Sequence, residues 1–352
     1  MATTAPTTPA PADTTVLVTG ASGFIAQHTI LRLLEAGYRV RGTVRSLSRE
    51  AEVRAVLAAN GGALDRFELV AADLMKDDGW RDAVRGCRFV QHVASPLPSK
   101  PPKHEDELIV PARDGALRVL AAAAAEGVAR VVMTSSVAAV VYGHARDGSR
   151  TYDEADWSQL TDEVGAYEKS KTIAERAAWD YVATLPAEGR PELVTVNPGL
   201  VLGPLLGADF STSGEVVRKL LKRELPGVPD IGWAVVDVRD VAAAHLAAMT
   251  TPAAAGQRFV LAIEHASMGD IAAILKATFG PRGYKVPTRR VPGWALKLVS
   301  LWDRTAKLAV QELGKRQDLS NQHARDVLGW QPHSLQDMVV SMGESMIAHG
   351  VV

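Results

Sequence analysis

The chain has 352 residues, of which 39 are Lys or Arg and 40 are Asp or Glu, so its formal net charge is −1. This near-neutral balance does not favour nucleic acid or an anionic membrane as a partner, and the length suits one large α/β unit with an appended lobe, or two domains. The single cysteine, Cys87, excludes an internal disulfide framework. We therefore expect a protein of the reducing cytoplasm.

The first 13 residues are mainly Thr, Pro and Ala and lack the basic start and apolar centre of a signal peptide. They predict a disordered leader, residues 1–13. No apolar run further along the chain reaches the length of a membrane span.

Short apolar runs alternate with helical patterns through the first 200 residues. The predicted strands are 15–20, 38–45, 67–74, 88–95, 129–136 and 192–199, and the predicted helices are 24–37, 49–60, 77–85, 105–126 and 164–185. Alternation of this kind predicts an α/β fold with a doubly wound parallel sheet covered on both faces.

The pattern changes after residue 200, where prolines and glycines interrupt the chain. The stretch 232–249 predicts a strand that runs into a helix, with Asp240 as the N-cap, and 258–262 predicts one more strand. We expect two units: a Rossmann-type domain of residues 14–200 plus about 232–262, and a smaller, mostly helical C-terminal lobe of about 201–231 and 263–352.

The sequence VLVTGASGFIAQH joins the first predicted strand to the first predicted helix. In such a turn Gly20 allows a tight bend, Gly23 lets the backbone approach a pyrophosphate, and the small Ala26 lets the helix pack close to the strand. The N-terminus of the helix then offers unpaired N–H groups to phosphates. The alternative is a purely structural turn in a non-binding α/β domain. The expected contacts of this loop with a dinucleotide are Gly20, Ser22, Gly23, Phe24 and Ile25.

The end of the second predicted strand indicates which dinucleotide binds. An NAD site usually carries an acidic residue there for the ribose hydroxyls, whereas this chain has Arg45, followed by Arg49. A guanidinium forms two parallel hydrogen bonds to a phosphate. The two arginines therefore predict NADP(H) as the cofactor, unless they are solvated surface charges.

Tyr167 and Lys171 are four residues apart in the sequence YEKSK, within a predicted helix. Residues at this spacing lie on one helix face, and a neighbouring ammonium is expected to lower the tyrosine pKa from about 10. Such a tyrosine can protonate a carbonyl oxygen that gains negative charge. The predicted strand before it ends in Ser135 and Ser136, which can hydrogen-bond the same oxygen. Taken alone, the tyrosine–lysine pair is common enough to occur by chance.

The chain resembles the extended short-chain dehydrogenases/reductases. The resemblance rests on TGASGFIA, Arg45, AADL, TSS, YEKSK and NPGLVLGP in that order, and on YDEADW, VDVRDVAAAHL and DLSNQHARDVLGWQP. The resemblance spans residues 15–345 approximately. Within the family, the chain is most similar to the dihydroflavonol reductase, cinnamoyl-CoA reductase and microbial aldehyde/ketone reductase branch. The resemblance implies a Rossmann-type cofactor domain and a small substrate lobe.

The resemblance also implies roles for individual positions. The catalytic triad would be Ser136, Tyr167 and Lys171, with Tyr167 and Lys171 also touching the cofactor. The remaining implied cofactor contacts are Asp73 and Leu74 at the adenine, Val93, Ala94 and Ser95 beside the ribose, and Pro198, Gly199 and Leu200 over the nicotinamide.

Two positions depart from the family pattern. Ala26 stands where glycine is usual, which does not exclude NADP, and Val141 stands where plant flavonol reductases carry an asparagine. The valine favours a less polar carbonyl substrate, apolar or aromatic. The loop residues Leu205, Leu206 and Phe210 are candidates for the pocket wall. Trp294, Leu298, Leu301 and Trp302 are interpreted as core, with a substrate wall as the alternative.

The sequence thus predicts an NADPH-dependent carbonyl reductase, acting on a small-molecule substrate as a monomer or homodimer, with the helices 105–126 and 164–185 as a possible two-fold interface. The histidines show no metal-like clustering, so no metal site is predicted. Two alternatives stay open: a sugar-nucleotide epimerase or dehydratase on the same scaffold, and a non-catalytic NADP-sensing protein.

Overall fold

The structure is a computed structural model that describes residues 10–96, 104–209, 212–302 and 304–352. The expected leader therefore lies mostly outside the described residues. Its last part differs from the expectation, because Pro11–Asp13 forms a 3-10 turn and the Thr14 hydroxyl donates a hydrogen bond to the carbonyl oxygen of Ala10.

Seven parallel strands form the central sheet, in the order β3-β2-β1-β4-β5-β6-β9. The order reverses between β1 and β4, which is the doubly wound Rossmann arrangement and creates a crevice at the carboxyl ends of the strands. The expected fold class is confirmed. The strand bounds are β1 Thr15–Val18, β2 Arg39–Val44, β3 Phe67–Ala71, β4 Phe89–His92, β5 Arg130–Thr134, β6 Glu192–Pro198 and β9 Arg258–Leu261.

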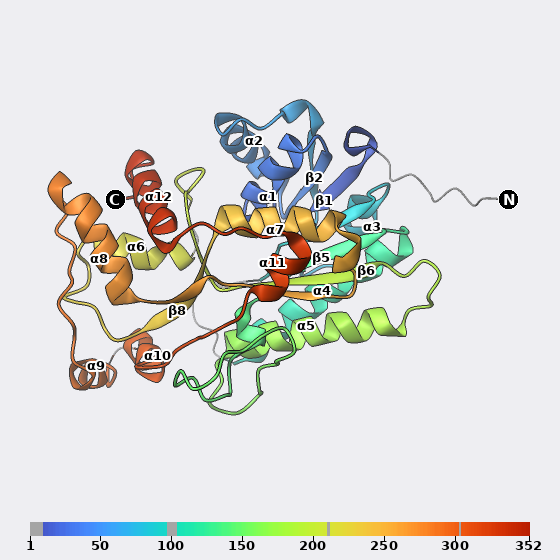
Figure 1. Ribbon diagram of the computed structural model, residues 1–352. Helices are drawn as coiled ribbons and strands as arrows, with labels where there is room; N and C mark the ends of the chain where they lie inside the picture. Colours follow the sequence, from blue (N-terminus) through green and yellow to red (C-terminus); the bar gives the residue numbers. More distant parts are fainter. Residues whose placement is uncertain (1–9, 97–103, 210–211, 303) are drawn as a thin grey trace.

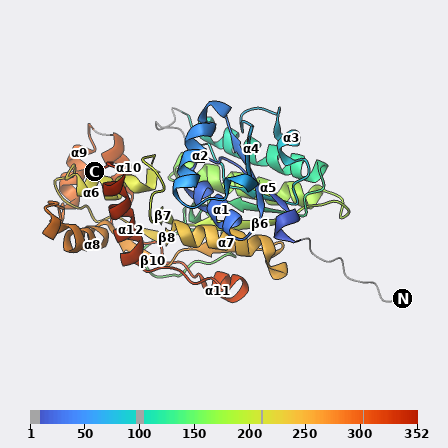
Figure 2. The same cartoon turned by 90° about the horizontal axis from the view of Figure 1, so that it is seen from above.

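Both faces of this sheet are covered by helices, as Figures 1 and 2 show. Alternate side chains of one strand enter opposite cores: Val16 and Val18 pack in the first core, and Leu17 packs in the second. The first core lies under α1 (Phe24–Glu35), α2 (Glu50–Ala59), α7 (Val238–Thr250) and α11 (Gln322–Leu328), and the second under α3 (Trp80–Val84), α4 (Asp106–Ala125) and α5 (Ala166–Thr184).

A second, three-stranded sheet has the order β10-β8-β7 and lies in the smaller lobe. Its strands are β7 Leu200–Leu202, β8 Gly232–Asp237 and β10 Glu264–Ser267. The expected division of 232–262 is therefore different in the structure: β8 pairs with β7 and β10 in the lobe, while α7 and β9 belong to the large domain. A third core of the lobe lies under α6 (Glu215–Leu221), α8 (Met268–Phe279) and α12 (Leu335–Ala348).

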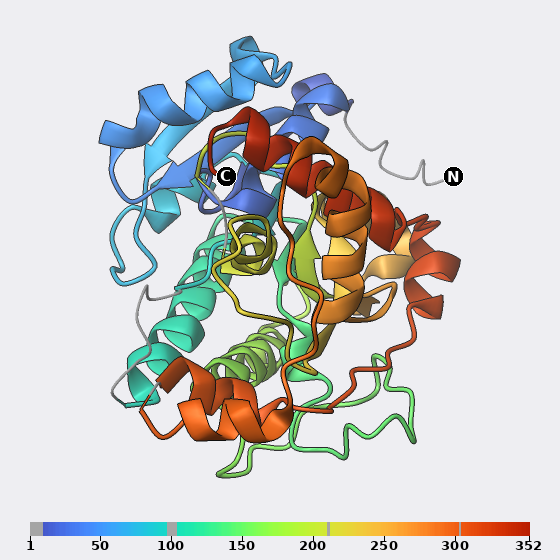
Figure 3. The ribbon, with the colours of Figure 1, turned by 90° about the vertical axis from the view of Figure 1, so that its left-hand side faces the viewer.

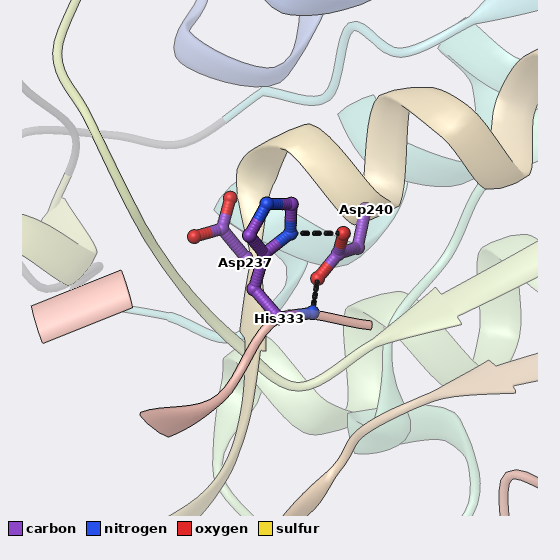
Figure 4. Close-up of side chains that lie close together, drawn as sticks. All are labelled: Asp237, Asp240 and His333. Atoms are coloured by element: carbon purple, nitrogen blue, oxygen red, sulfur yellow. Dashed lines mark hydrogen bonds and ion pairs between the residues drawn. The ribbon is translucent and has the colours of Figure 1, made fainter. Parts of the chain in front are cut away.

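The prediction that Asp240 caps α7 is wrong. The strand β8 runs on to Asp237, so the helix begins three residues earlier and the Asp237 carboxylate accepts a 2.8 Å hydrogen bond from the Arg239 backbone N–H. Asp240 is instead buried in the first turn, where it accepts hydrogen bonds from the backbone N–H of His333 (2.7 Å) and pairs with its Nδ1 (2.6 Å) (Figure 4). It thus fastens the segment before α12 to the large domain.

Two short helices, α9 (Gly293–Val299) and α10 (Arg304–Gln311), lie at the lower edge of the lobe in Figure 3. The expectation of core packing here is wrong: Trp294 is 71% and Trp302 77% exposed. Among the described residues, no helix is both long enough and apolar enough to cross a membrane.

Candidate active site

A cavity of about 480 Å³ opens at the carboxyl ends of the central strands, beside the lobe. It brings together every expected site residue except Arg49 and Leu200, and it also includes several residues that sequence reasoning did not single out. The residues that it adds are Thr43, Val44, Ala72, Met75, Trp80, Pro96, Thr134, Val201 and Ser213. Four of them, Thr43, Val44, Ala72 and Thr134, lie at or directly after strand ends, which is the signal that could have found them.

The glycine turn after β1 is held by the neighbouring strand. Gly20 has φ +69°, and an added Cβ would lie 3.0 Å from the Ala94 Cβ, so only glycine fits without strain. Its N–H donates to the Thr43 hydroxyl (3.0 Å), and the Gly23 N–H donates to the Gly20 carbonyl (2.8 Å). The turn leads into α1, whose first N–H groups have no intrahelical acceptor. This is a cradle suited to a pyrophosphate.

The two arginines after β2 have different surroundings. Arg45 lines the cavity, is exposed, and forms no ion pair with any residue that the structure describes. Arg49 lies beside the cavity: its guanidinium donates to the Ser22 hydroxyl (3.2 Å) and pairs with Glu52 (2.6 Å) and Asp209 (3.3 Å). The free guanidinium at the cavity is therefore that of Arg45.

The far strand ends complete the cofactor side of the cavity. Asp73 and Leu74 follow β3, and the Asp73 carboxylate accepts from the Met75 N–H (3.0 Å) while its backbone carbonyl accepts from the Trp80 indole (3.0 Å). After β4, the Ala94 N–H donates to the Thr19 hydroxyl (2.9 Å), which fixes the segment that carries Val93 and Ser95 along the cavity wall.

The loop between β6 and β7 closes the cavity on the lobe side. Pro198 and Gly199 line it, and a Cβ at Gly199 would lie 2.2 Å from the Ala234 carbonyl oxygen, so the backbone must pass close to β8. Leu200 does not reach the cavity and packs instead against the core of the lobe.

Ser136, Tyr167 and Lys171 meet on one wall of the cavity. Helix α5 begins at Ala166, so Tyr167 lies in its first turn and Lys171 lies one turn later on the same face. The Lys171 Nζ is 5.9 Å from the centre of the Tyr167 ring. Ser136 is buried to 8% exposure at the end of β5.

The pKa values of this group differ from the expectation. Although Tyr167 keeps 38% of its surface exposed at the cavity, loss of water around it raises its pKa above the ordinary value, while a hydrogen bond with Ser136 lowers it. The expected lowering by Lys171 is not found. Burial instead lowers the pKa of Lys171 to about 8, and the nearby charge of Glu175 opposes that shift.

The three residues between Tyr167 and Lys171 are all at least partly buried. Ser170 is buried and its hydroxyl donates to the Tyr167 carbonyl (2.7 Å). Lys169 pairs with Glu105 at 2.7 Å, and burial raises the pKa of Glu168.

The expected substrate-wall residues are mostly elsewhere. Val141 is fully buried among Val137, Val140 and Tyr152, so it does not face the cavity. Leu205 is buried in the core of the lobe. Leu206 does not line the cavity either, and Phe210 lies outside the described residues.

Among the described residues, one group of side chains could hold a metal ion: Asp237, Asp240 and His333, whose ligand atoms lie within 4.8 Å of one another. Both carboxylates already have partners, because Asp237 pairs with Arg239 (2.7 Å) and Asp240 with His333. The group does not line the cavity.

Comparisons with known proteins identify what the chain is similar to. The model of the "NAD dependent epimerase/dehydratase family" matches residues 16–262. Cinnamoyl-CoA reductase 1 of Arabidopsis thaliana is 38% identical over 282 residues, which are 79% of this chain and 78% of that protein. A putative anthocyanidin reductase of Ginkgo biloba is 36% identical over 291 residues, 78% of this chain and 83% of that protein.

Among solved structures, the yeast methylglyoxal/isovaleraldehyde reductase Gre2 complexed with NADPH has a TM-score of 0.80 to this chain. The two are 28% identical, and the match covers 96% of this chain and 100% of Gre2.

Proposed function

The chain belongs to the NAD dependent epimerase/dehydratase family, within the extended short-chain dehydrogenases/reductases that its motifs resemble, and on that premise we propose that it is an NADPH-dependent carbonyl reductase. The observation that carries this proposal is the convergence of Tyr167, Lys171 and Ser136 with the glycine turn and the free Arg45 in one cavity. The chain is an NADP-dependent oxidoreductase, as its relatives named reductases and the NADPH-bound Gre2 support.

The residues of the cavity fit the cofactor. The turn at Gly20 and the start of α1 would hold the pyrophosphate. Arg45, which has no partner among the described residues, would hold the 2′-phosphate by two parallel hydrogen bonds. Asp73 and Leu74 would contact the adenine, and the segment Val93–Ser95 the ribose. Pro198 and Gly199 would cover the nicotinamide, while Leu200 supports that loop from the lobe.

The same wall carries the proton chemistry. NADPH, when bound, supplies the hydride that reduces the carbonyl carbon. Tyr167 donates its phenolic proton to the carbonyl oxygen, and its raised pKa keeps that proton in place at neutral pH. Ser136 hydrogen-bonds the same oxygen and orients it. Lys171, one turn further along the same face of α5, would hold the nicotinamide ribose through its ammonium group.

The substrate is a small carbonyl compound, apolar or aromatic, because Pro198 and Val201 line the cavity and its charged lining residues, Arg45, Asp73 and Lys171, are assigned to the cofactor. The enzyme works in the cytoplasm as a monomer or as a homodimer. In a homodimer, α4 and α5 would form the interface.

Cys87 is buried and burial raises the pKa of its thiol to about 11, so it takes no part in the reaction.

The test is the turnover of Tyr167→Phe with a panel of aldehydes and ketones. The variant should bind NADPH as the wild type does and lose most of its turnover, since it keeps the ring and removes only the proton. Unchanged turnover would refute the proton-donor role. An enzyme that is purified with tightly held NAD and reduces no member of the panel would favour the epimerase or dehydratase alternative.

A further inference from the structure

Glu175 is a fully buried carboxylate on α5, below the cavity wall. Its two oxygens collect donors from three strands of the sheet and from its own helix. Oε2 accepts from Ser135 Oγ (2.5 Å) and Asn197 Nδ2 (2.7 Å), and Oε1 accepts from Arg258 Nε (2.7 Å), Thr195 Oγ1 (2.9 Å) and Trp179 Nε1 (3.4 Å).

These contacts hold the backbone that carries the catalytic serine. Ser135 directly precedes Ser136 at the end of β5. Asn197, at the end of β6, donates both to Glu175 and to the Ser136 carbonyl oxygen (3.2 Å). Glu175 therefore fixes the two strand ends between which the hydroxyl of Ser136 is presented.

Glu175 also lies one turn after Lys171 on the same face of α5. It is the one group found to raise the pKa of the lysine, against the stronger effect of burial. The other titratable groups around the lysine carry no opposite charge: His92 on β4 is buried and neutral, with its pKa lowered to about 3 partly by Lys171 itself, and Tyr167 is protonated.

Arg258, from β9, pairs with Glu175 but has its own anchors on the opposite side. It donates to the backbone carbonyls of Glu154 (2.6 Å) and Asp156 (2.8 Å), and its guanidinium lies 3.7 Å from the centre of the Trp157 ring. A buried ion pair by itself is weak support for stability, so a purely structural pair does not explain why the carboxylate sits directly below the lysine and serine.

We propose that Glu175 is a positioning residue of the reaction: it keeps Lys171 in its ammonium form and holds the strand ends that present Ser136. The inference rests on the proposed function, because the proposed reductase mechanism uses that ammonium. A structural role alone would predict loss of stability when Glu175 changes, without any change in the protonation of Lys171.

The test compares Glu175→Gln with Glu168→Gln. Both remove a carboxyl from α5, but Glu168 is only partly buried and is not among the groups that shift the pKa of Lys171. The first readout is trace acetylation of Lys171 by acetic anhydride, followed by mass spectrometry from pH 6 to pH 11 in the ligand-free protein. The second is the pH profile of kcat/KM with NADPH and an aldehyde of the panel that the enzyme reduces.

In Glu175→Gln the Lys171 pKa should fall by about one unit, and the alkaline limb of kcat/KM should move to lower pH by the same amount. In Glu168→Gln the Lys171 titration should not move. Glu175→Asp, which keeps the charge, should bring the Lys171 pKa part of the way back to the wild-type value. An unchanged Lys171 titration in folded Glu175→Gln overturns the proposal.

Glu175→Gln leaves Arg258 buried without its partner and can fail to fold. The double variant Glu175→Gln/Arg258→Met removes both charges and should show the same displaced Lys171 titration, whereas a wild-type titration in it overturns the proposal. The acetylation readout is independent of turnover. If the wild-type protein reduced no member of the panel, the proposed function would fail while the protonation of Lys171 could still be decided.

Discussion

The Nζ of Lys171 lies 5.9 Å from the centre of the Tyr167 ring, yet the lysine does not lower the pKa of the tyrosine in this structure. The sequence analysis expected a lowered pKa at the tyrosine, whereas the lowered pKa in the structure is that of the lysine. Burial brings the lysine, rather than the tyrosine, close to neutral pH. In the proposed mechanism, the lysine would then be the group that limits activity in alkaline solution.

We expect kcat/KM to fall as pH rises through about 8. Burial lowers the pKa of Lys171 from 10.5 to about 8, so the ammonium is present below that pH and is lost above it. The profile of kcat/KM reports groups of the free enzyme. Lys171→Arg is the matched variant, because a guanidinium stays charged throughout this range: its activity should be lower, but the limb near pH 8 should be absent. The same limb in both proteins would assign it to another group.

Arg45→Asp should raise the KM for NADPH by about 10- to 100-fold, the loss expected for a charge-assisted phosphate contact of about 1.5–3 kcal/mol, and should change the KM for NADH far less. The measurement is steady-state kinetics with both cofactors.

Arg49→Gln is the control for that substitution. Arg49 is already paired with Glu52 and Asp209, so its replacement should change the preference for NADPH much less. Equal effects on NADPH and NADH in Arg45→Asp would remove the assignment of the 2′-phosphate to this residue.

Gly20→Ala should weaken NADPH binding more than tenfold and destabilise the fold by about 1–3 kcal/mol, because a side chain at φ +69° is strained and would meet Ala94. Gly61→Ala is the matched control: φ is +83°, but no atom lies within 4 Å of the added Cβ. It should share the loss in stability and keep wild-type affinity. Thermal unfolding and fluorescence titration with NADPH measure the two effects. Similar affinity losses in both variants would contradict the proposed cradle.

Local spacing in the sequence determined much of this protein. The alternation of strands and helices predicted the doubly wound sheet. The glycine turn, Arg45 at the end of β2 and the four-residue step from Tyr167 to Lys171 predicted residues that do meet in one cavity. These features could be predicted because a period of 2.0 or 3.6 residues fixes which side chains share a face, and parallel strands end at one edge of their sheet.

Only the tertiary structure decided the features that depend on partners distant in the sequence. Pairing with β7 and β10 placed β8 in the lobe, and packing removed Val141 from the cavity. Ion pairs with Glu52 and Asp209 hold the guanidinium of Arg49 beside the cavity. The donors that surround Glu175 come from β5, β6 and β9, separated by up to 83 positions from it. Burial and charge pairing arise from such contacts, so the pKa of Lys171 and the part of Glu175 in it could not be obtained from local spacing.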